Sequence, residues 1–434
     1  MIWRLVALFT LMALPLRAEI DIREVTSPGG IKAWLVEDHS IPFTALEIRF
    51  QGGTSLDAPG KRGAVNLMTG LIEEGAAEMD AQGFATARDA LAAEFRFSAS
   101  VDALSVSARM LTENRDRAAE LLRLALVAPR FDADALERVR GQVLAGLRSA
   151  EKDPGEIAAR LFDAQAFGDH PYGSSGDGTV DSVTALTRDD ILAAHKGALA
   201  RDRVYVAAVG DITAAQLGSL LDHLLRDLPA TGTPLPAMAQ VGLTGGVTVQ
   251  DFPTPQAVVR FGQTGIERDD PDYFAAFVLN EVLGGSRFGS RLMEELREKR
   301  GLTYGVGTYL ADYDQADLLI GQFATDNRTA VEAVAILQAE WARAAQGVTE
   351  AELQAAKTYL TGAYPLRFDG NGTIANILVG MQMSGFSADY PKTRNAKVEA
   401  VTLEDVARVA ARLIRPDALR VVVVGQPEGL QSTP

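Results

Sequence analysis

The chain has 434 residues, of which 47 % are hydrophobic and 23 % are charged, and its formal net charge is −15. This is the composition of a folded globular protein, and the length is sufficient for two or more domains. The acidic balance argues against nucleic acid or an anionic membrane surface as a partner. The absence of cysteine excludes thiolate metal sites, cysteine nucleophiles and disulfides.

The first 18 residues have the order of a secretory signal peptide. A short basic start ending at Arg4 precedes an apolar run over residues 5–16, and Ala18 offers a small residue at a cleavage point. The apolar run is short for a membrane span. We therefore expect residues 1–18 to be removed and the mature chain to begin at Glu19 in a bacterial periplasm. The alternative is an uncleaved membrane anchor, since Leu16 fits the −3 position of a cleavage site poorly.

The rest of the sequence contains an internal repeat. The fragment Ile-Arg-Phe at 48–50 recurs as Val-Arg-Phe at 259–261, which is 211 positions later. Each half begins with an alternating strand pattern followed by a helical run, and each half ends in an apolar strand pattern. The strand–helix pairs are at 43–53 with 63–74 and at 256–265 with 273–283, and the final strands are at 204–211 and 420–426. Nearly equal offsets at both ends indicate a duplicated domain.

Residues 229–246 are rich in proline, glycine and threonine and lack a helical period, which is typical of a linker. They divide the mature chain into an N-terminal domain at 19–228 and a C-terminal domain at 247–434. Strand patterns in each half are followed by helical ones, such as those at 115–127 and 134–150. The predicted fold class is therefore α+β, with two homologous domains that each have a mostly antiparallel sheet covered on one face by helices.

Residues 63–76 (GAVNLMTGLIEEGA) are similar to the zinc-binding helix of the pitrilysin/insulinase family of metallopeptidases. In that family an H-x-x-E-H motif places two histidine ligands on one helix face, with a glutamate that activates water. Alignment of the flanking glycines places Asn66, Thr69 and Gly70 at these three positions. A third family ligand, a glutamate on a later helix, falls near Gly146.

None of these four residues suits a catalytic zinc site. An asparagine amide is a weak neutral ligand, threonine is no general base near neutral pH, and glycine has no side chain. The four histidines, His39, His170, His195 and His223, are never spaced to share a helix face. We expect no metal or other cofactor in this chain, and no peptide hydrolysis by this chain alone.

Residues 283–309 resemble the second signature of the family, in which an arginine and a tyrosine complete the active site from the domain that faces the zinc. The resemblance places these roles on Arg297 and Tyr304. A phenol can donate to a developing oxyanion, and a guanidinium can bind peptide carbonyls or a carboxylate through its fork of donors. From the residues alone, Arg297 would be surface charge near a glycine-capped helix end, and Tyr304 a strand residue. The glycines at 284, 285 and 289 indicate a hinge or tight turn, since a phosphate loop would end in Lys-Ser/Thr.

The resemblance extends from about residue 20 to about residue 427 and implies one half of a clam-shell chamber. It further implies a homologous zinc-bearing partner with an intact H-x-x-E-H, and short or unfolded peptides as substrates. One alternative is a non-proteolytic peptide-binding or assembly protein of the same fold, against which the retention of both Arg297 and Tyr304 argues. Another is an active homodimeric peptidase with an unusual metal site, against which the missing ligands argue.

Overall fold

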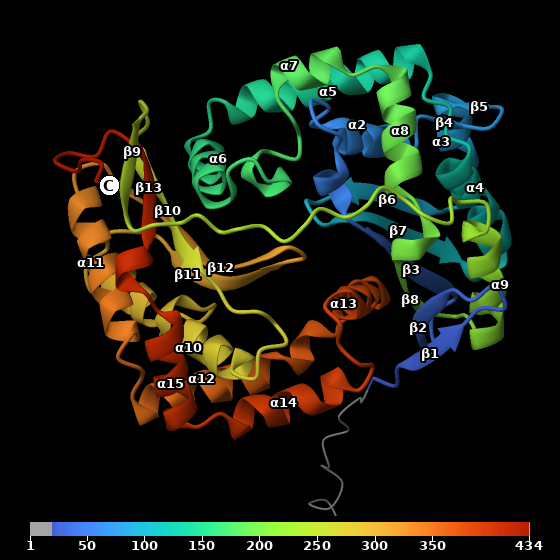
Figure 1. Cartoon of the computed structure of the whole chain (residues 1–434). Coiled ribbons are helices and arrows are strands. Elements are labelled where there is room, and N and C mark those ends of the chain that lie inside the picture. Colours follow the sequence, from blue (N-terminus) through green and yellow to red (C-terminus); the bar gives the residue numbers. More distant parts are fainter. Residues whose placement is uncertain (1–19, 434) are drawn as a thin grey trace, which may run out of the picture.

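The computed structural model describes residues 20–433, so the predicted signal peptide at 1–18 lies outside the described residues. The described chain forms two α/β halves that face each other in a ring-like arrangement (Figure 1). The N-terminal half runs from β1 to α9 and the C-terminal half from β9 to β13. Among residues 20–433, no helix has both the length and the apolar character that crossing a membrane requires.

The N-terminal half is built on a six-stranded sheet in the order β1-β2-β8-β3-β7-β6. Only β2 and β8 pair in parallel. The strands are β1 (Arg23–Thr26), β2 (Lys32–Glu37), β3 (Phe43–Gln51), β6 (Glu94–Ala99), β7 (Ala103–Leu111) and β8 (Val204–Gly210). Its helices are α2 (Ala64–Leu71), α3 (Ala81–Ala90), α4 (Arg115–Val127), α5 (Ala133–Ala150), α7 (Val180–Ala185), α8 (Arg188–Ala198) and α9 (Ala214–Leu225), and β4 (Gly75–Ala76) with β5 (Met79–Asp80) makes a small ribbon.

The C-terminal half has a five-stranded sheet in the order β11-β12-β10-β13-β9, in which only β13 and β9 pair in parallel. This repeats the order β6-β7-β3-β8-β2 of the first sheet, so the mostly antiparallel fold and its duplication are confirmed. The strands are β9 (Gly246–Asp251), β10 (Gln256–Thr264), β11 (Val306–Tyr313), β12 (Ala316–Asp326) and β13 (Arg420–Gly425). The helices outside this sheet are α10 (Tyr273–Gly284), α11 (Ala330–Ala344), α12 (Glu350–Ala363), α14 (Tyr390–Ala400) and α15 (Leu403–Leu413).

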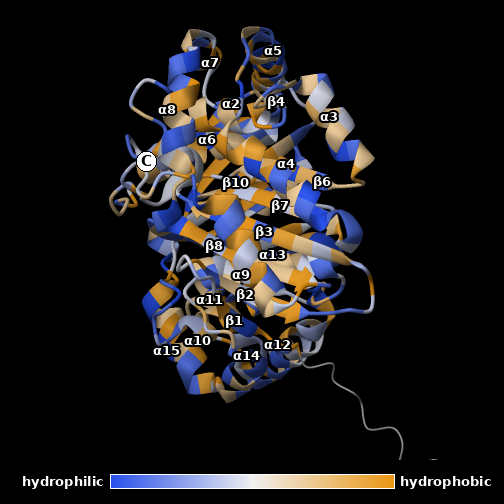
Figure 2. Cartoon of the chain, turned by 90° about the vertical axis from the view of Figure 1, so that its right-hand side faces the viewer, coloured by the Kyte–Doolittle hydropathy of each residue, from blue (hydrophilic) through white to orange (hydrophobic). Residues whose placement is uncertain are grey.

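Strand alternation explains how each sheet is buried. Along β3, Leu46, Ile48 and Phe50 are fully buried and belong to the core shared with the outer helices. Figure 2 shows hydrophobic residues concentrated along the strands and mixed faces on the surrounding helices, as expected for half-buried amphipathic elements. Residues 229–245 contain no helix or strand before β9 begins.

Helices cover both faces of each sheet, which corrects the prediction that they cover one face only. Helix α6 (Pro154–Phe167) comes from the N-terminal half but packs on β10 and β13 of the C-terminal sheet. Helix α13 (Asn371–Met383) comes from the C-terminal half but packs on β3 and β8 of the N-terminal sheet. Both helices lie inside the ring in Figure 1. The two halves therefore exchange one helix each.

The repeated arginines of the two halves contact the exchanged helices. Arg49 on β3 donates through Nη2 to the Asn376 Oδ1 atom on α13 at 2.7 Å. Arg260 on β10 has Nη2 at 3.8 Å from the Asp163 Oδ1 atom on α6, and its Cζ lies 5.5 Å from the Phe162 ring centroid. Burial raises the pKa of Asp163 to about 6, and the charge of Arg260 opposes that rise. The sequence repeat thus marks a repeated contact with the opposite half.

A second connection joins the turns of two hairpins. The Tyr172 hydroxyl donates to the Asp102 carboxylate, which lies between β6 and β7. The same hydroxyl accepts from the Gln315 backbone N–H at 3.0 Å, between β11 and β12. Gln51 Nε2 also donates to Asp314 Oδ2 at 2.8 Å. These bonds and the exchanged helices join the halves into one unit.

The helix exchange predicts that a substitution in one half weakens the sheet of the other. Phe162 on α6 is fully buried against the C-terminal sheet, so Phe162→Ala should lower the free energy of unfolding by about 3–5 kcal/mol. Denaturant unfolding measures the loss, and hydrogen exchange should show faster opening of β10 and β13. Phe84→Ala on α3, equally buried in the N-terminal core, is the matched control and should leave local exchange in β10 and β13 unchanged. Faster exchange confined to the N-terminal half in Phe162→Ala would contradict the coupling.

Candidate functional site

The helix that corresponds to the zinc helix, α2, has a well-defined start. The Asp57 carboxylate accepts the backbone N–H groups of Gly63 and Val65, both at 2.8 Å, and Arg62 Nη1 lies 3.3 Å from the same carboxylate. Gly63 has φ 93°, a conformation that favours glycine. A carboxylate at this position satisfies helix N–H groups that would otherwise lack partners. The local structure of the helix is therefore intact.

The four positions of the degenerate zinc site offer no useful ligand. Thr69 is 5 % exposed, and its hydroxyl donates to the Val65 carbonyl of its own helix at 2.7 Å. Asn66 is half-buried, whereas Gly70 and Gly146 are exposed. Helix α2 does pack on α5, the helix that carries Gly146, and a Cβ at Gly70 would lie 3.1 Å from Val139 Cγ1 of α5. The two helices that would carry a zinc site, α2 and α5, are therefore adjacent. The residues at the four ligand and base positions nevertheless do not fit a zinc ion.

Residues 20–433 contain no group of three or more His, Asp or Glu side chains that could hold a metal ion. The histidines are dispersed over separate elements, and each has a local partner. These partners are Asp211 for His39, the Ala237 carbonyl for His170, the Leu126 carbonyl for His195 and Glu120 for His223.

The arginine of the second signature lies on a π-helix. Residues Met293–Glu298 form this wide turn (η5), near the helix end that the sequence indicated. Met293 and Leu296 are buried, so the helix is fixed to the core on one side. Gly301, with φ 64°, donates its N–H to the Arg297 carbonyl at 2.9 Å and ends the helix as the sequence indicated. π-Turns inside helices occur frequently at functional sites.

Arg297 and Tyr304 are available for contacts outside the chain. The Arg297 side chain is 35 % exposed, its Nε lies 3.6 Å from Glu298 Oε1, and its Cζ lies 4.7 Å from the ring centroid of Phe288. Tyr304 is 88 % exposed. Within residues 20–433, its ring and hydroxyl make no hydrogen bond or ring contact. A tyrosine in this position contributes little to the core, and its ring and hydroxyl are accessible to another molecule.

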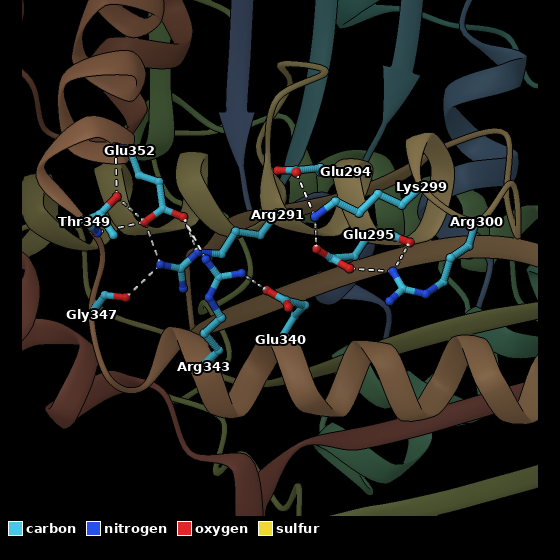
Figure 3. A network of polar contacts seen from close by, with 10 residues as sticks. All are labelled: Arg291, Glu294, Glu295, Lys299, Arg300, Glu340, Arg343, Gly347, Thr349 and Glu352. Carbon is cyan, nitrogen blue, oxygen red and sulfur yellow. Dashed lines mark hydrogen bonds and ion pairs between the residues drawn. The ribbon is translucent and has the colours of Figure 1, made fainter.

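An ion pair between the buried Arg291 and the half-buried Glu352 fixes the segment before the π-helix (Figure 3). Arg291 binds Glu352 at the start of α12 through Nε and Nη2, at 2.7 and 2.8 Å, and its Nη2 also donates to the Gly347 carbonyl at 3.1 Å. Glu352 completes a capping box with Thr349. The hydrogen bonds from Arg291 hold the pKa of Glu352 down to about 2. This bidentate pair attaches the signature segment to α12.

Lys299 and Arg300, which follow the π-helix, share the carboxylate of Glu295. Lys299 Nζ lies 2.6 Å from Glu295 Oε1, and Arg300 pairs with Glu295 Oε2 (Figure 3). These two contacts lower the pKa of Glu295. Among the cations of residues 293–300, Arg297 thus has the longest contact with a carboxylate. The sequence did not indicate the roles of Phe288 or Glu352, because a ring contact and an ion pair between distant residues leave no periodic signal.

Comparison with known proteins agrees with this geometry. Residues 185–360 match a family model described as the peptidase M16 inactive domain. The chain is 27 % identical over 374 residues to a Helicobacter pylori protein named non-peptidase homolog YmxG, covering 85 % of this chain and 86 % of that protein. It is 27 % identical over 415 residues to an uncharacterized zinc protease of Streptomyces coelicolor, covering 92 % and 89 %. A crystal structure titled peptidase M16 inactive domain, from Pseudomonas fluorescens, superposes with a TM-score of 0.87 and 28 % identity, covering 95 % of this chain and all of that one.

The chain has the duplicated α/β shell of a peptidase and keeps the helix that would carry the zinc site. It lacks the zinc ligands, as in a non-catalytic member of such a class. The chain is similar to proteins of the peptidase M16 family, and its residues 185–360 match the model of the inactive domain of that family. The resemblance to the pitrilysin/insulinase type of metallopeptidase is thereby confirmed.

The side chains at the degenerate site predict that the purified chain retains no zinc. After exhaustive dialysis, elemental analysis should find well under one zinc per chain, because no three His, Asp or Glu side chains among residues 20–433 are grouped so that they could hold the ion. Asn66→Ala is the matched variant and should give the same value. Stoichiometric zinc that is lost in Asn66→Ala would show that the site binds metal after all.

Proposed function

We propose that this chain is the non-catalytic subunit of a two-chain zinc peptidase. A homologous partner with an intact H-x-x-E-H would hold the zinc, and this chain would contribute Arg297 and Tyr304 to the same cleft. The observation that carries the proposal is Tyr304, whose 88 % exposure leaves it without a use inside the chain. The absence of zinc ligands at Asn66, Thr69, Gly70 and Gly146 supports the proposal that the partner, and not this chain, holds the zinc.

The two side chains suit complementary tasks in peptide hydrolysis. Zinc in the partner would polarise the scissile carbonyl and activate water. The Tyr304 hydroxyl would donate to the oxyanion that develops on the carbonyl oxygen. The Arg297 fork would bind a peptide carbonyl or carboxylate in both the ground state and the transition state. The substrates would be short or unfolded peptides, because a closed chamber between two shells excludes folded proteins.

A second function in competition is a non-proteolytic peptide-binding or assembly protein. The name of the Helicobacter pylori relative, a non-peptidase homolog, favours this alternative. An assembly role, however, requires neither an exposed tyrosine nor an arginine left without a strong ion pair. The kinetic experiment below separates the two functions.

The proposed partnership predicts co-purification from the native cell. We propose that the chain is exported, so it should be recovered from the periplasmic fraction with its N-terminus at Glu19. An affinity-tagged chain should bring down a homologous chain that contains H-x-x-E-H and zinc in a one-to-one ratio. Mass spectrometry identifies the partner chain, and N-terminal sequencing determines the first residue of the mature chain. Recovery of the chain alone at physiological concentration would contradict the partnership, and an intact Met1 in the membrane fraction would favour an anchor.

The proposed cleft predicts distinct kinetic defects in the reconstituted pair. Tyr304→Phe should lower kcat about a hundredfold with little change in KM, since it removes an oxyanion donor. Arg297→Ala should also raise KM, because the guanidinium binds the ground-state peptide as well. Kinetics at saturating partner, with complex size checked by light scattering, measure these effects.

Two matched variants control for loss of an exposed ring hydroxyl or surface cation. Tyr359 on α12 is 37 % exposed, and Arg328 is an exposed arginine paired with the nearby Asp326. Tyr359→Phe and Arg328→Ala should both leave the kinetics unchanged. Normal turnover in Tyr304→Phe would reduce this chain to a binding or assembly protein.

A further inference from the structure

Buried polar atoms without hydrogen-bond partners gather around residues 284–290, between α10 and the π-helix. Within residues 20–433 these atoms include Asn280 Oδ1, Glu281 Oε1, Arg287 Nε, Ser290 Oγ and Thr308 Oγ1. Asn280, Glu281, Ser290 and Thr308 are each at most 7 % exposed. Buried polar groups without partners cost free energy, and such groups are rare unless they serve a purpose. The glycine loop at 284–290 therefore packs against a cluster of buried polar groups from α10 and β11.

Glu281 lies directly beneath the loop. A Cβ at Gly285 would come within 2.1 Å of Glu281 Oε2, so the carboxylate is packed against a backbone position that only glycine fits. Arg287 Nε lies 3.8 Å from Glu281 Oε1. Burial raises the pKa of Glu281, and the backbone N–H groups of Arg287 and Ser286 oppose that rise. The carboxylate thus attracts the loop through one side chain and two backbone groups.

The loop presents Phe288 to the functional arginine. Phe288 is 64 % exposed, and its ring centroid lies 4.7 Å from Arg297 Cζ. A guanidinium over an aromatic ring is held in place while its outward-facing donors stay available. The far end of the loop is fixed separately, because Arg291 binds Glu352. Contacts therefore run from Glu281 through the loop to Phe288 and on to Arg297.

We propose that Glu281 is a positioning residue, which holds the loop 284–290 so that Phe288 orients the Arg297 guanidinium toward the peptide. The proposal rests on the proposed function, since it assigns Arg297 to peptide binding. Glu281 touches neither the peptide nor the reacting atoms. The effect of Glu281 on the site passes through Phe288, an uncharged side chain whose ring contacts Arg297.

Glu281→Gln tests the proposal in the zinc-bearing two-chain complex. The substitution keeps the size of the side chain and removes the charge that attracts the loop. KM for an unstructured peptide should rise about tenfold, with a smaller change in kcat, because the carboxylate charge that faces Arg287 is lost. The effect should disappear when Phe288 or Arg297 is already alanine, since coupled residues are not additive. In the chain without its partner, the Ser286 and Arg287 amides should exchange about tenfold faster.

Two further variants make the result unambiguous. Gly285→Ala displaces the loop from its other side, where the added Cβ would meet the Glu281 carboxylate, and should raise KM in the same way. Glu47→Gln alters another buried carboxylate, which lies on β3 of the N-terminal half and accepts from the Ser107 hydroxyl at 2.8 Å, and it should change neither KM nor the exchange of the loop.

The outcomes separate this inference from the proposed function. A rise in KM that persists in the Phe288→Ala and Arg297→Ala backgrounds would mean that Glu281 acts on general stability, and would overturn the proposal. Faster loop exchange with unchanged KM would overturn it too. A damaged Arg297→Ala complex with a normal Glu281→Gln complex contradicts this inference alone, whereas a normal Arg297→Ala complex contradicts the proposed function.

Discussion

The structure depends on the exchange of two helices between its halves. Each sheet has an inner face with apolar residues that the helices of its own half leave uncovered. In the N-terminal sheet Trp34, Ala207 and Val209 are buried beneath α13, and in the C-terminal sheet Val422 and Val424 are buried beneath α6. Removing either helix would expose this surface to water. Because each helix is covalently part of the opposite half, the halves have one relative orientation, and every surface that faces the interior of the ring inherits it.

The degenerate zinc helix shows that fold and catalysis occupy different positions of the same element. Leu67, Met68 and Leu71 of α2 are fully buried and contribute to the core. Asn66 and Gly70 lie outside that core. A family member can therefore lose its metal ligands without losing the helix, since the ligand positions carry little of the packing energy. Asp57 continues to cap the helix whether or not the helix binds a metal.

In the second signature, close ion pairs occupy Arg291, Lys299 and Arg300 but not Arg297. Arg291 is occupied by Glu352, while Lys299 and Arg300 share Glu295. Arg297 retains a longer contact with its neighbour Glu298 and a ring contact with Phe288. In a chain with a net charge of −15, this pairing leaves the Arg297 guanidinium as the cation of residues 293–300 with the longest contact to a carboxylate. A nearby exposed tyrosine adds a neutral donor to the same segment.

Much of the fold followed from sequence alone. Alternation and helical period predicted β3, α2, β10, α10, β8 and β13, and the repeat at 48–50 and 259–261 predicted two similar halves. The empty zinc positions and the Arg297–Tyr304 pair came from motif resemblance, and their assembly with a partner chain stays a proposal. Periodicity shows which face of a helix or strand is apolar, but it does not show which element will cover that face. Only tertiary structure could therefore decide that α6 and α13 exchange halves, that Arg291 binds Glu352, and that Phe288 lies against Arg297. Each of these contacts joins residues whose proximity depends on how the whole chain closes.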